Sequence, residues 1–166
     1  MSRWQLVGMI VPIVISLAAA LFSGLQWRET HNQLALSMKP AVDFDTADDP
    51  DDPPIGISIS NSGPGPAVIR SISYYVDRKQ VKGPEEAAQL GKLDVDELSA
   101  FEFDEGDTLA VGQKEWLFRY RKTSKPDEAE AQRYADFMGT HLGIEAEFCS
   151  VLGDCWIKCS TRGRCE

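Results

Sequence analysis

Residues 55–76, IGISISNSGPGPAVIRSISYYV, hold two runs of alternating or β-branched residues separated by a turn rich in glycine and proline. Alternation with a period of two places the apolar side chains on one face, which predicts two half-buried β-strands. A phosphate-binding loop needs free backbone N–H groups, and the two prolines of this turn remove two of them. We therefore interpret the turn as structural. Its members are Asn61, Gly63, Gly65 and Pro66.

Similar β-type segments lie on both sides of this stretch. The predicted strands are residues 41–45, 55–59, 67–76, 114–121, 144–151 and 156–160, with a shorter alternating segment at Phe101 and Phe103. Residues 126–142 instead place apolar side chains three and four positions apart, which predicts an amphipathic helix, and residues 84–90 predict one or two helical turns. Six or seven short strands with one inserted α-helix indicate an antiparallel β-sandwich, Ig-like in class.

The helix predicted at residues 126–142 has one apolar face. This face consists of Ala131, Tyr134, Phe137, Met138 and Leu142. Strand 114–121 offers a matching surface, because a period of two places Trp116, Phe118 and Tyr120 together. We expect the helix to pack against that surface.

The first part of the chain has a different character. Residues 4–27, WQLVGMIVPIVISLAAALFSGLQW, carry no formal charge. As a helix they would extend roughly 35 Å, enough to cross a hydrocarbon core of about 30 Å. We predict a transmembrane anchor and stalk over residues 1–37, with the span at about residues 5–26, followed by the β domain at residues 38–166. A cleaved signal peptide is the alternative, because residues 18–20 (AAA) fit a cleavage site.

Small residues recur every fourth position along the predicted span. They are Gly8, Ser16, Ala20 and Gly24, and Pro12 interrupts the series. Such a stripe lets two membrane helices approach closely. We therefore expect association through this helix with another protein or with a second copy of the chain.

Charge excludes one class of partner. The 166 residues include 17 Lys and Arg against 26 Asp and Glu, a net charge of −9, so nucleic-acid binding is disfavoured. The aspartates of residues 43–52 are ligands suited to Ca²⁺, but they lack the EF-hand pattern. The carboxylates of residues 102–107 carry no informative spacing. We interpret both groups as solvated loops and predict no metal or cofactor, with calcium binding as the alternative.

His141 is the one histidine of the predicted β domain. No nucleophile motif accompanies it, so we predict no catalytic residue. An enzyme that uses His141 or the acidic loops is the alternative.

All four cysteines lie near the end of the chain. They are Cys149, Cys155, Cys159 and Cys165. Their spacing, C-x5-C-x3-C-x5-C, differs from the paired knuckles of zinc sites, and we predict the disulfides Cys149–Cys155 and Cys159–Cys165. Because disulfides persist in oxidising compartments, we expect the β domain to face away from the cytoplasm. Four free thiols in a reducing compartment are the alternative.

Three short blocks of the sequence together carry a resemblance to known proteins. They are THNQLALSMKP (30–40), GISISNSGPGPAVIRSISYYVD (56–77) and FCSVLGDCW (148–156). The chain resembles a group of small bacterial single-pass membrane proteins with a juxtamembrane HN-x-L-x-L-S-x-x-P pattern and an N-x-G-x-GPA-x-I turn. The resemblance implies a single-pass protein of the inner membrane. Because that group has no established activity, it implies no catalytic residue.

Together these features predict a non-catalytic, membrane-anchored β-sandwich that binds another protein or belongs to a membrane complex. The alternatives are the enzyme or calcium-binding module described above, and a cytoplasm-facing accessory of a membrane effector.

Overall fold

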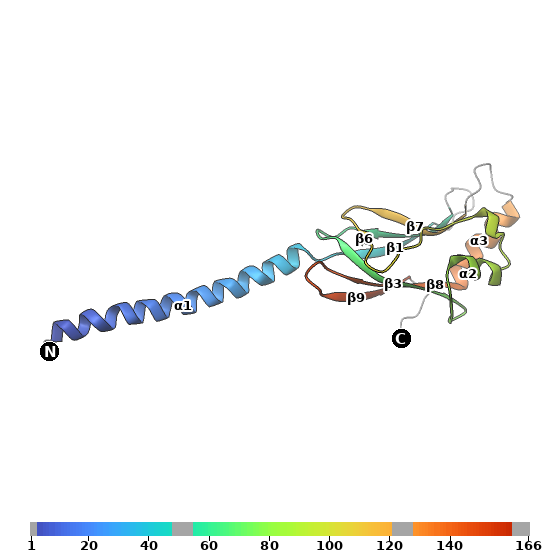
Figure 1. Cartoon of the computed structure of the whole chain (residues 1–166). Helices are drawn as coiled ribbons and strands as arrows, with labels where there is room; N and C mark the ends of the chain where they lie inside the picture. The colour runs from blue at the N-terminus through green and yellow to red at the C-terminus, as the bar shows by residue number, and fades with distance from the viewer. Residues whose placement is uncertain (1–2, 48–54, 121–127, 161–166) are drawn as a thin grey trace. The chain divides into compact units, whose positions relative to one another are not determined.

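The computed structural model describes residues 3–47, 55–120 and 128–160, with side chains described from residue 13 in the first range and from residue 129 in the last. The chain opens with one long helix, α1 (Arg3–Ser37), drawn in blue in Figure 1. Among the helices described, none combines the length and the apolar character needed to cross a membrane.

The chain divides into two compact units, Met1–Ser37 and Met38–Glu166. The second unit, the β domain, contains two antiparallel sheets. The strands of the first sheet are β1 (Val42–Ala47), β2 (Gly56–Asn61), β5 (Leu98–Ser99) and β7 (Lys114–Tyr120). The strands of the second sheet are β3 (Ala67–Val76), β4 (Lys79–Val81), β6 (Thr108–Leu109), β8 (Leu142–Cys149) and β9 (Cys155–Cys159). The predicted mainly-β class is confirmed.

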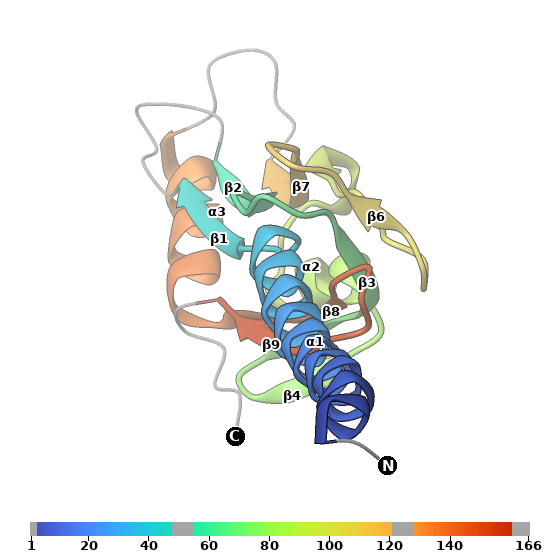
Figure 2. The same ribbon diagram turned by 90° about the vertical axis from the view of Figure 1, so that its left-hand side faces the viewer.

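The strand orders are β1-β2-β7-β5 in the first sheet and β4-β3-β8-β9 in the second, where β6 also pairs with β3. Figures 1 and 2 show the two sheets as separate layers of the domain. Fully buried side chains from both sheets, such as Ile59, Ile69 and Ile144, belong to one apolar core. Across the layers, the buried hydroxyl of Tyr74 donates a hydrogen bond to the Leu117 carbonyl at 3.4 Å.

Strand β7 departs from simple alternation. Ile57 of β2 pairs with Phe118 and the next residue, Ser58, pairs with Trp116, so Leu117 is an extra residue in the ladder. Such a bulge changes which face the following side chains occupy. Leu117 and Phe118 are both fully buried, whereas Trp116 is only partly buried. The prediction that Trp116 shares a face with Phe118 is therefore wrong, because a bulge separates them.

Three helical segments accompany the sheets: α2 (Pro84–Leu90), the 3₁₀ turn η1 (Val95–Glu97) and α3 (Glu128–Thr140). Helix α3 contacts β2 of the first sheet and β8 of the second. Figure 1 shows α2 and α3 at one end of the domain, in the region of the β3–β4 turn.

Helix α3 is shorter than predicted. Residues 126 and 127 of the predicted helix lie outside the described residues. At the other end, Leu142 opens strand β8 opposite Val76 instead of closing the helix. The helix prediction ran too far because the apolar spacing of a buried strand continued that of the helix.

The buried face of α3 packs as expected against β7. The ring of Phe118 lies 6.4 Å from that of Tyr134 and 6.0 Å from that of Phe137, measured between centroids. The rings of Tyr120 and Tyr134 are 4.5 Å apart. The predicted contact is confirmed for these four aromatic residues.

The alternating segment at Phe101 and Phe103 does not form a strand. The two rings instead pack edge to face with centroids 4.8 Å apart, and the Phe101 N–H donates to the Trp116 carbonyl at 2.8 Å. The strand that pairs here is β5, slightly earlier in the chain. Helix α2 has the predicted bounds.

Candidate functional site

At one end of the domain, loops meet around the side chain of Asn61. Its Oδ1 accepts hydrogen bonds from the N–H groups of Ala41 and Gly63, both at 3.1 Å. Its Nδ2 donates to the carbonyls of Gly65 at 2.9 Å and Leu109 at 3.1 Å. All four hydrogen-bonding positions of this buried amide are therefore occupied by the protein itself, which suits a structural role.

The two glycines of the same turn touch neighbouring backbone. A Cβ atom at Gly63 would overlap the backbone of Ala41, and one at Gly65 would overlap that of Met38. Only glycine fits such close approaches. We call the loops gathered here (residues 38–41, 61–66, 110–113 and 150–154) the closed end of the domain.

The loop of residues 150–154 is closed by a disulfide. Cys149 and Cys155 face each other in the β8–β9 ladder and form the predicted bond, with Cα atoms 3.9 Å apart. The Ser150 hydroxyl also accepts from the N–H groups of Leu152 and Asp154. Cys159 is disulfide-bonded as well, and its predicted partner, Cys165, lies outside the described residues.

The acidic loops show no cation site in the described part of the chain, where no three His, Cys, Asp or Glu side chains gather to hold a metal. Asp43 pairs with Lys158 at 2.7 Å, and Asp45 pairs with Lys114 at 3.2 Å. The other aspartates of the predicted calcium loop, from residue 48 onward, lie outside the described residues. In residues 102–107, Glu105 pairs with Arg70 at 3.7 Å, and Asp107 accepts from the N–H of Asp104.

The small-residue stripe lies on α1. Gly8 falls outside the described side chains. Ser16 and Ala20 line a shallow depression of about 380 Å³ with two larger apolar neighbours. Gly24 has open space where a Cβ would be.

The opposite end of the β domain is more open. Here the β3–β4 turn consists of Asp77 and Arg78, which both have left-handed backbone, with φ of 49° and 68°. Two such residues match the type I′ turn that joins tightly paired strands. The Asp77 carboxylate lies 2.7 Å from Nδ1 of His141, which immediately precedes β8. We call this region, with α2, η1 and α3, the helical end.

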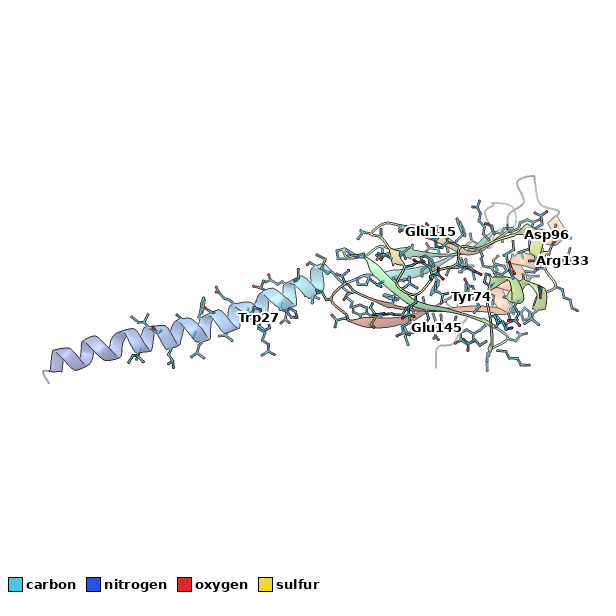
Figure 3. All side chains as sticks on the ribbon, in the orientation of Figure 1. Trp27, Tyr74, Asp96, Glu115, Arg133 and Glu145 are labelled. Carbon is cyan, nitrogen blue, oxygen red and sulfur yellow. A yellow bond between two sulfur atoms is a disulfide. The ribbon has the colours of Figure 1, made fainter. Side chains whose placement is uncertain are left out.

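A cavity of about 440 Å³ opens beside this His–Asp pair. Its lining includes Asp77, Lys92, Arg133, Phe137 and His141. A second cavity of about 340 Å³ shares Lys92 and Arg133 with the first. Figure 3 shows Arg133 at this end of the domain, in the region of Asp96 of η1.

Two tyrosines act as hydrogen-bond donors in the interior. The Tyr134 hydroxyl donates to the Asp94 carbonyl at 2.6 Å. Burial, followed by the charges of Asp94 and Glu130, raises the pKa of Tyr134 far above its usual range. Burial, with a smaller effect of Glu102, raises the pKa of Tyr74 in the same way. Both hydroxyls therefore stay protonated at neutral pH.

The sequence pointed to His141 but missed Asp77, Lys92 and Arg133. Their meeting depends on which strands pair, since residues 77 and 141 come together through the β3–β8 ladder. The turn after strand 67–76 was the one signal that could have marked Asp77.

The larger cavity has a mixed lining. It combines cationic, acidic and aromatic side chains, and its described lining contains no serine, threonine or cysteine that His141 could activate. No protein-family model, curated protein or solved structure matches the chain.

Proposed function

We propose that this protein is a membrane-anchored, Ig-like β-sandwich that binds another protein as part of a membrane complex. Helix α1 would hold the domain at the membrane, and the β domain would carry the binding surface. Tethering raises the local concentration of the domain, so that even a weak contact becomes effective.

The observation that carries the proposal is the exposure of apolar side chains along α1. Eight large apolar side chains between residues 13 and 27 are each 57% to 71% exposed. The consecutive residues Ile13, Val14 and Ile15 point in three directions around the helix. A helix that is apolar on all sides requires an apolar environment, either lipid or a protein core. Together with the uncharged run of residues 4–27, this favours lipid.

The strand order supports the Ig-like assignment. In Ig domains one sheet has the order A-B-E-D, and the other contains C, F and G, with C′ added beside C in some domains. The first sheet fits this scheme if β1, β2, β7 and β5 are taken as A, B, E and D. The second fits if β4, β3, β8 and β9 are taken as C′, C, F and G. Many domains of this architecture act in recognition, and the architecture alone sets no activity.

The Cys149–Cys155 disulfide supports a domain that faces an oxidising compartment. Labelling intact cells with a membrane-impermeant thiol reagent, before and after reduction, tests this topology. An outward domain labels only after reduction. Labelling that requires an opened membrane and no reductant would place the domain in the cytoplasm and contradict the proposal.

Site-specific photocrosslinking in native membranes tests the binding role. Photoreactive p-benzoylphenylalanine replaces Leu90 at the helical end, Val111 at the closed end or Ile157 in β9, all of which are more than half exposed. We expect one position to give a single adduct with a defined membrane protein, and the other two to give none. Absence of an adduct from all three positions would count against a protein-binding role.

A further inference from the structure

The closed end carries a large share of the exposed apolar side chains of the β domain. Among the described residues of the domain, six large apolar side chains are exposed, and three of them lie on two loops of this end. Val111 and Val151 are each 54% exposed, and Leu152 is 41% exposed. Single exposed apolar residues are common on protein surfaces, but a group of them on neighbouring loops points to a contact.

The two loops leave the second sheet side by side. Val68 of β3 pairs with Thr108 of β6 on one side and with Cys149 of β8 on the other. Paired strands are about 4.8 Å apart, so the loops that follow β6 and β8 begin within roughly 10 Å of each other. Figure 1 shows the β8–β9 turn at the end of the domain opposite α2 and α3. The three apolar side chains therefore belong to one end of the domain.

The closed end is also nearly uncharged. Within its four loops only Lys39 and Asp154 carry a formal charge, although 26% of the whole chain is charged. The helical end instead has charges of both signs around its cavities, among them Asp77, Lys92 and Arg133. Charged groups lose free energy when they enter a lipid interface, whereas apolar side chains gain it. The composition of the closed end therefore suits a lipid surface.

The two charges of the closed end are compatible with such a surface. Nζ of Lys39 lies 5.5 Å from the centre of the Trp156 ring. Tryptophan rings are enriched at the headgroup level of membranes, and lysine side chains extend along apolar surface to keep their ammonium in water. Asp154 is exposed, so its carboxylate keeps its hydration in the headgroup layer.

The chain from α1 enters the β domain at this same end, through residues 38–41. Ten helical residues separate the end of the uncharged run at Trp27 from residue 38, which corresponds to roughly 15 Å. The tip of the β8–β9 turn lies three residues beyond Trp156, the neighbour of Lys39, and so extends roughly 10 Å past the entry point. The headgroup layer is about 5–7 Å thick on each side of the hydrocarbon core. An anchored chain therefore has the reach to bring the tip into this layer.

We propose that the closed end rests on the membrane that holds α1, with Val111, Val151 and Leu152 inserted among the lipid headgroups. The inference rests on the membrane anchor proposed above and adds a lipid-binding surface to it. The Cys149–Cys155 disulfide and the hydrogen bonds of the turn fix the tip in advance, so that contact requires little ordering of the loop. The helical end and β9 then remain available to a protein partner.

Photocrosslinking in vesicles of palmitoyl-oleoyl phosphatidylcholine that contain the same lipid in tritiated form tests this. The full chain carries p-benzoylphenylalanine at Val151 or, as a control of matched exposure, at Leu90 of the helical end, which is 58% exposed. A third chain carries it at Leu21 of α1, where the anchor requires lipid contact. We expect lipid adducts from Leu21 and Val151 and at least about tenfold less from Leu90, because a side chain held in the interface meets lipid at a far higher effective concentration.

A charged tip provides the second test. Val151→Asp/Leu152→Asp replaces two exposed side chains, so the domain should keep its fold, which circular dichroism verifies. With the photoreactive group at Val111, this double variant should lose most of the lipid adduct, since carboxylates resist entry into lipid. Leu90→Asp is the matched control and should leave the adduct at Val111 unchanged.

The outcomes separate this inference from the anchor itself. An adduct at Leu21 with equal labelling at Val151 and Leu90 would overturn the lipid contact and leave the anchor intact. A full adduct at Val111 in the folded double variant, or an adduct of Val151 with a second copy of the chain in place of lipid, would overturn it too. Absence of an adduct at Leu21 would reject the anchor and this inference with it.

Discussion

The two ends of the β domain differ in what their polar side chains contact. At the closed end, the Asn61 amide uses all its hydrogen bonds on the protein, and glycines let backbones touch. At the helical end, charged side chains of both signs, among them Asp77, Lys92 and Arg133, border two open cavities. A loop cluster whose polar groups are satisfied internally maintains structure, whereas charged side chains that border open cavities are within reach of a ligand.

The helical end nevertheless contains the residue whose loss should cost the most stability. Phe137 is 5% exposed and packs against Phe118 and the backbone of Gly91. Phe137→Ala should reduce the free energy of unfolding by about 3–5 kcal/mol, because it removes a buried ring and leaves a cavity. Denaturant titration in detergent measures this change in the free energy of unfolding. The exposed neighbour Leu90 serves as the control, and Leu90→Ala should cost less than about 0.5 kcal/mol. A loss below about 1 kcal/mol for Phe137→Ala would show that α3 is a mobile cover.

The next largest effect should come from Asn61. Asn61→Ala leaves four backbone groups of the closed end without their partner, and we expect a loss of about 3 kcal/mol, since water can reach some of them. Ser62→Ala is the matched control, because its exposed hydroxyl makes one long hydrogen bond of 3.3 Å to the Ala41 carbonyl. If both variants unfold at the same denaturant concentration, the closed end does not depend on its buried amide.

Removal of the disulfide should have a smaller effect at the same end. The double variant Cys149→Ala/Cys155→Ala opens a short loop, for which the chain-entropy estimate is about 2 kcal/mol. Thermal unfolding compared with Leu152→Ala, a change in the same loop, isolates the contribution of the bond. Unchanged stability would show that the β8–β9 hairpin holds its shape through its ladder and the Ser150 hydrogen bonds alone.

Ionisation of the two interior tyrosines should have the smallest effect on stability at neutral pH. Because folding raises the pKa of Tyr74 and Tyr134, both stay protonated in the folded state above pH 10, where the unfolded chain ionises. Their contribution to stability is therefore complete below about pH 10 and is lost as the pH rises further.

Absorbance at 295 nm follows this titration. Of the four tyrosines, at least two should ionise only when the protein unfolds. Tyr134→Phe should remove one of the late steps. Ionisation of all four near pH 10 in a protein that keeps its circular dichroism would contradict the burial of these hydroxyls.

The sequence was most informative where residues that favour β-structure are dense. Strand β3 has the bounds predicted for it, because six of its ten residues are β-branched or aromatic and favour a strand. Strand β7 was located correctly, but its faces were not, since the Leu117 bulge depends on pairing with β2 and leaves no pattern in a single sequence.

The candidate site was harder to predict than the fold. The disulfide joins neighbours in one hairpin, so local spacing was sufficient to find it. The cavity beside His141 instead assembles residues from three separate segments, at Asp77, Lys92 and Arg133. Their proximity is a property of strand order and helix packing, which sequence periodicity does not encode.

The Asn61 network also has a mechanical consequence. If α1 anchors the chain as proposed, any pulling force enters the β domain through the segment that follows α1, and this segment reaches Ala41 before it enters β1. Asn61 accepts a hydrogen bond from the Ala41 N–H, and further hydrogen bonds join it to Leu109 of β6 in the second sheet and to Gln113, which precedes β7 of the first sheet. The hydrogen bonds of Asn61 would therefore spread a pulling force over both sheets at this junction, before the force reaches the hydrogen bonds between β1 and β2.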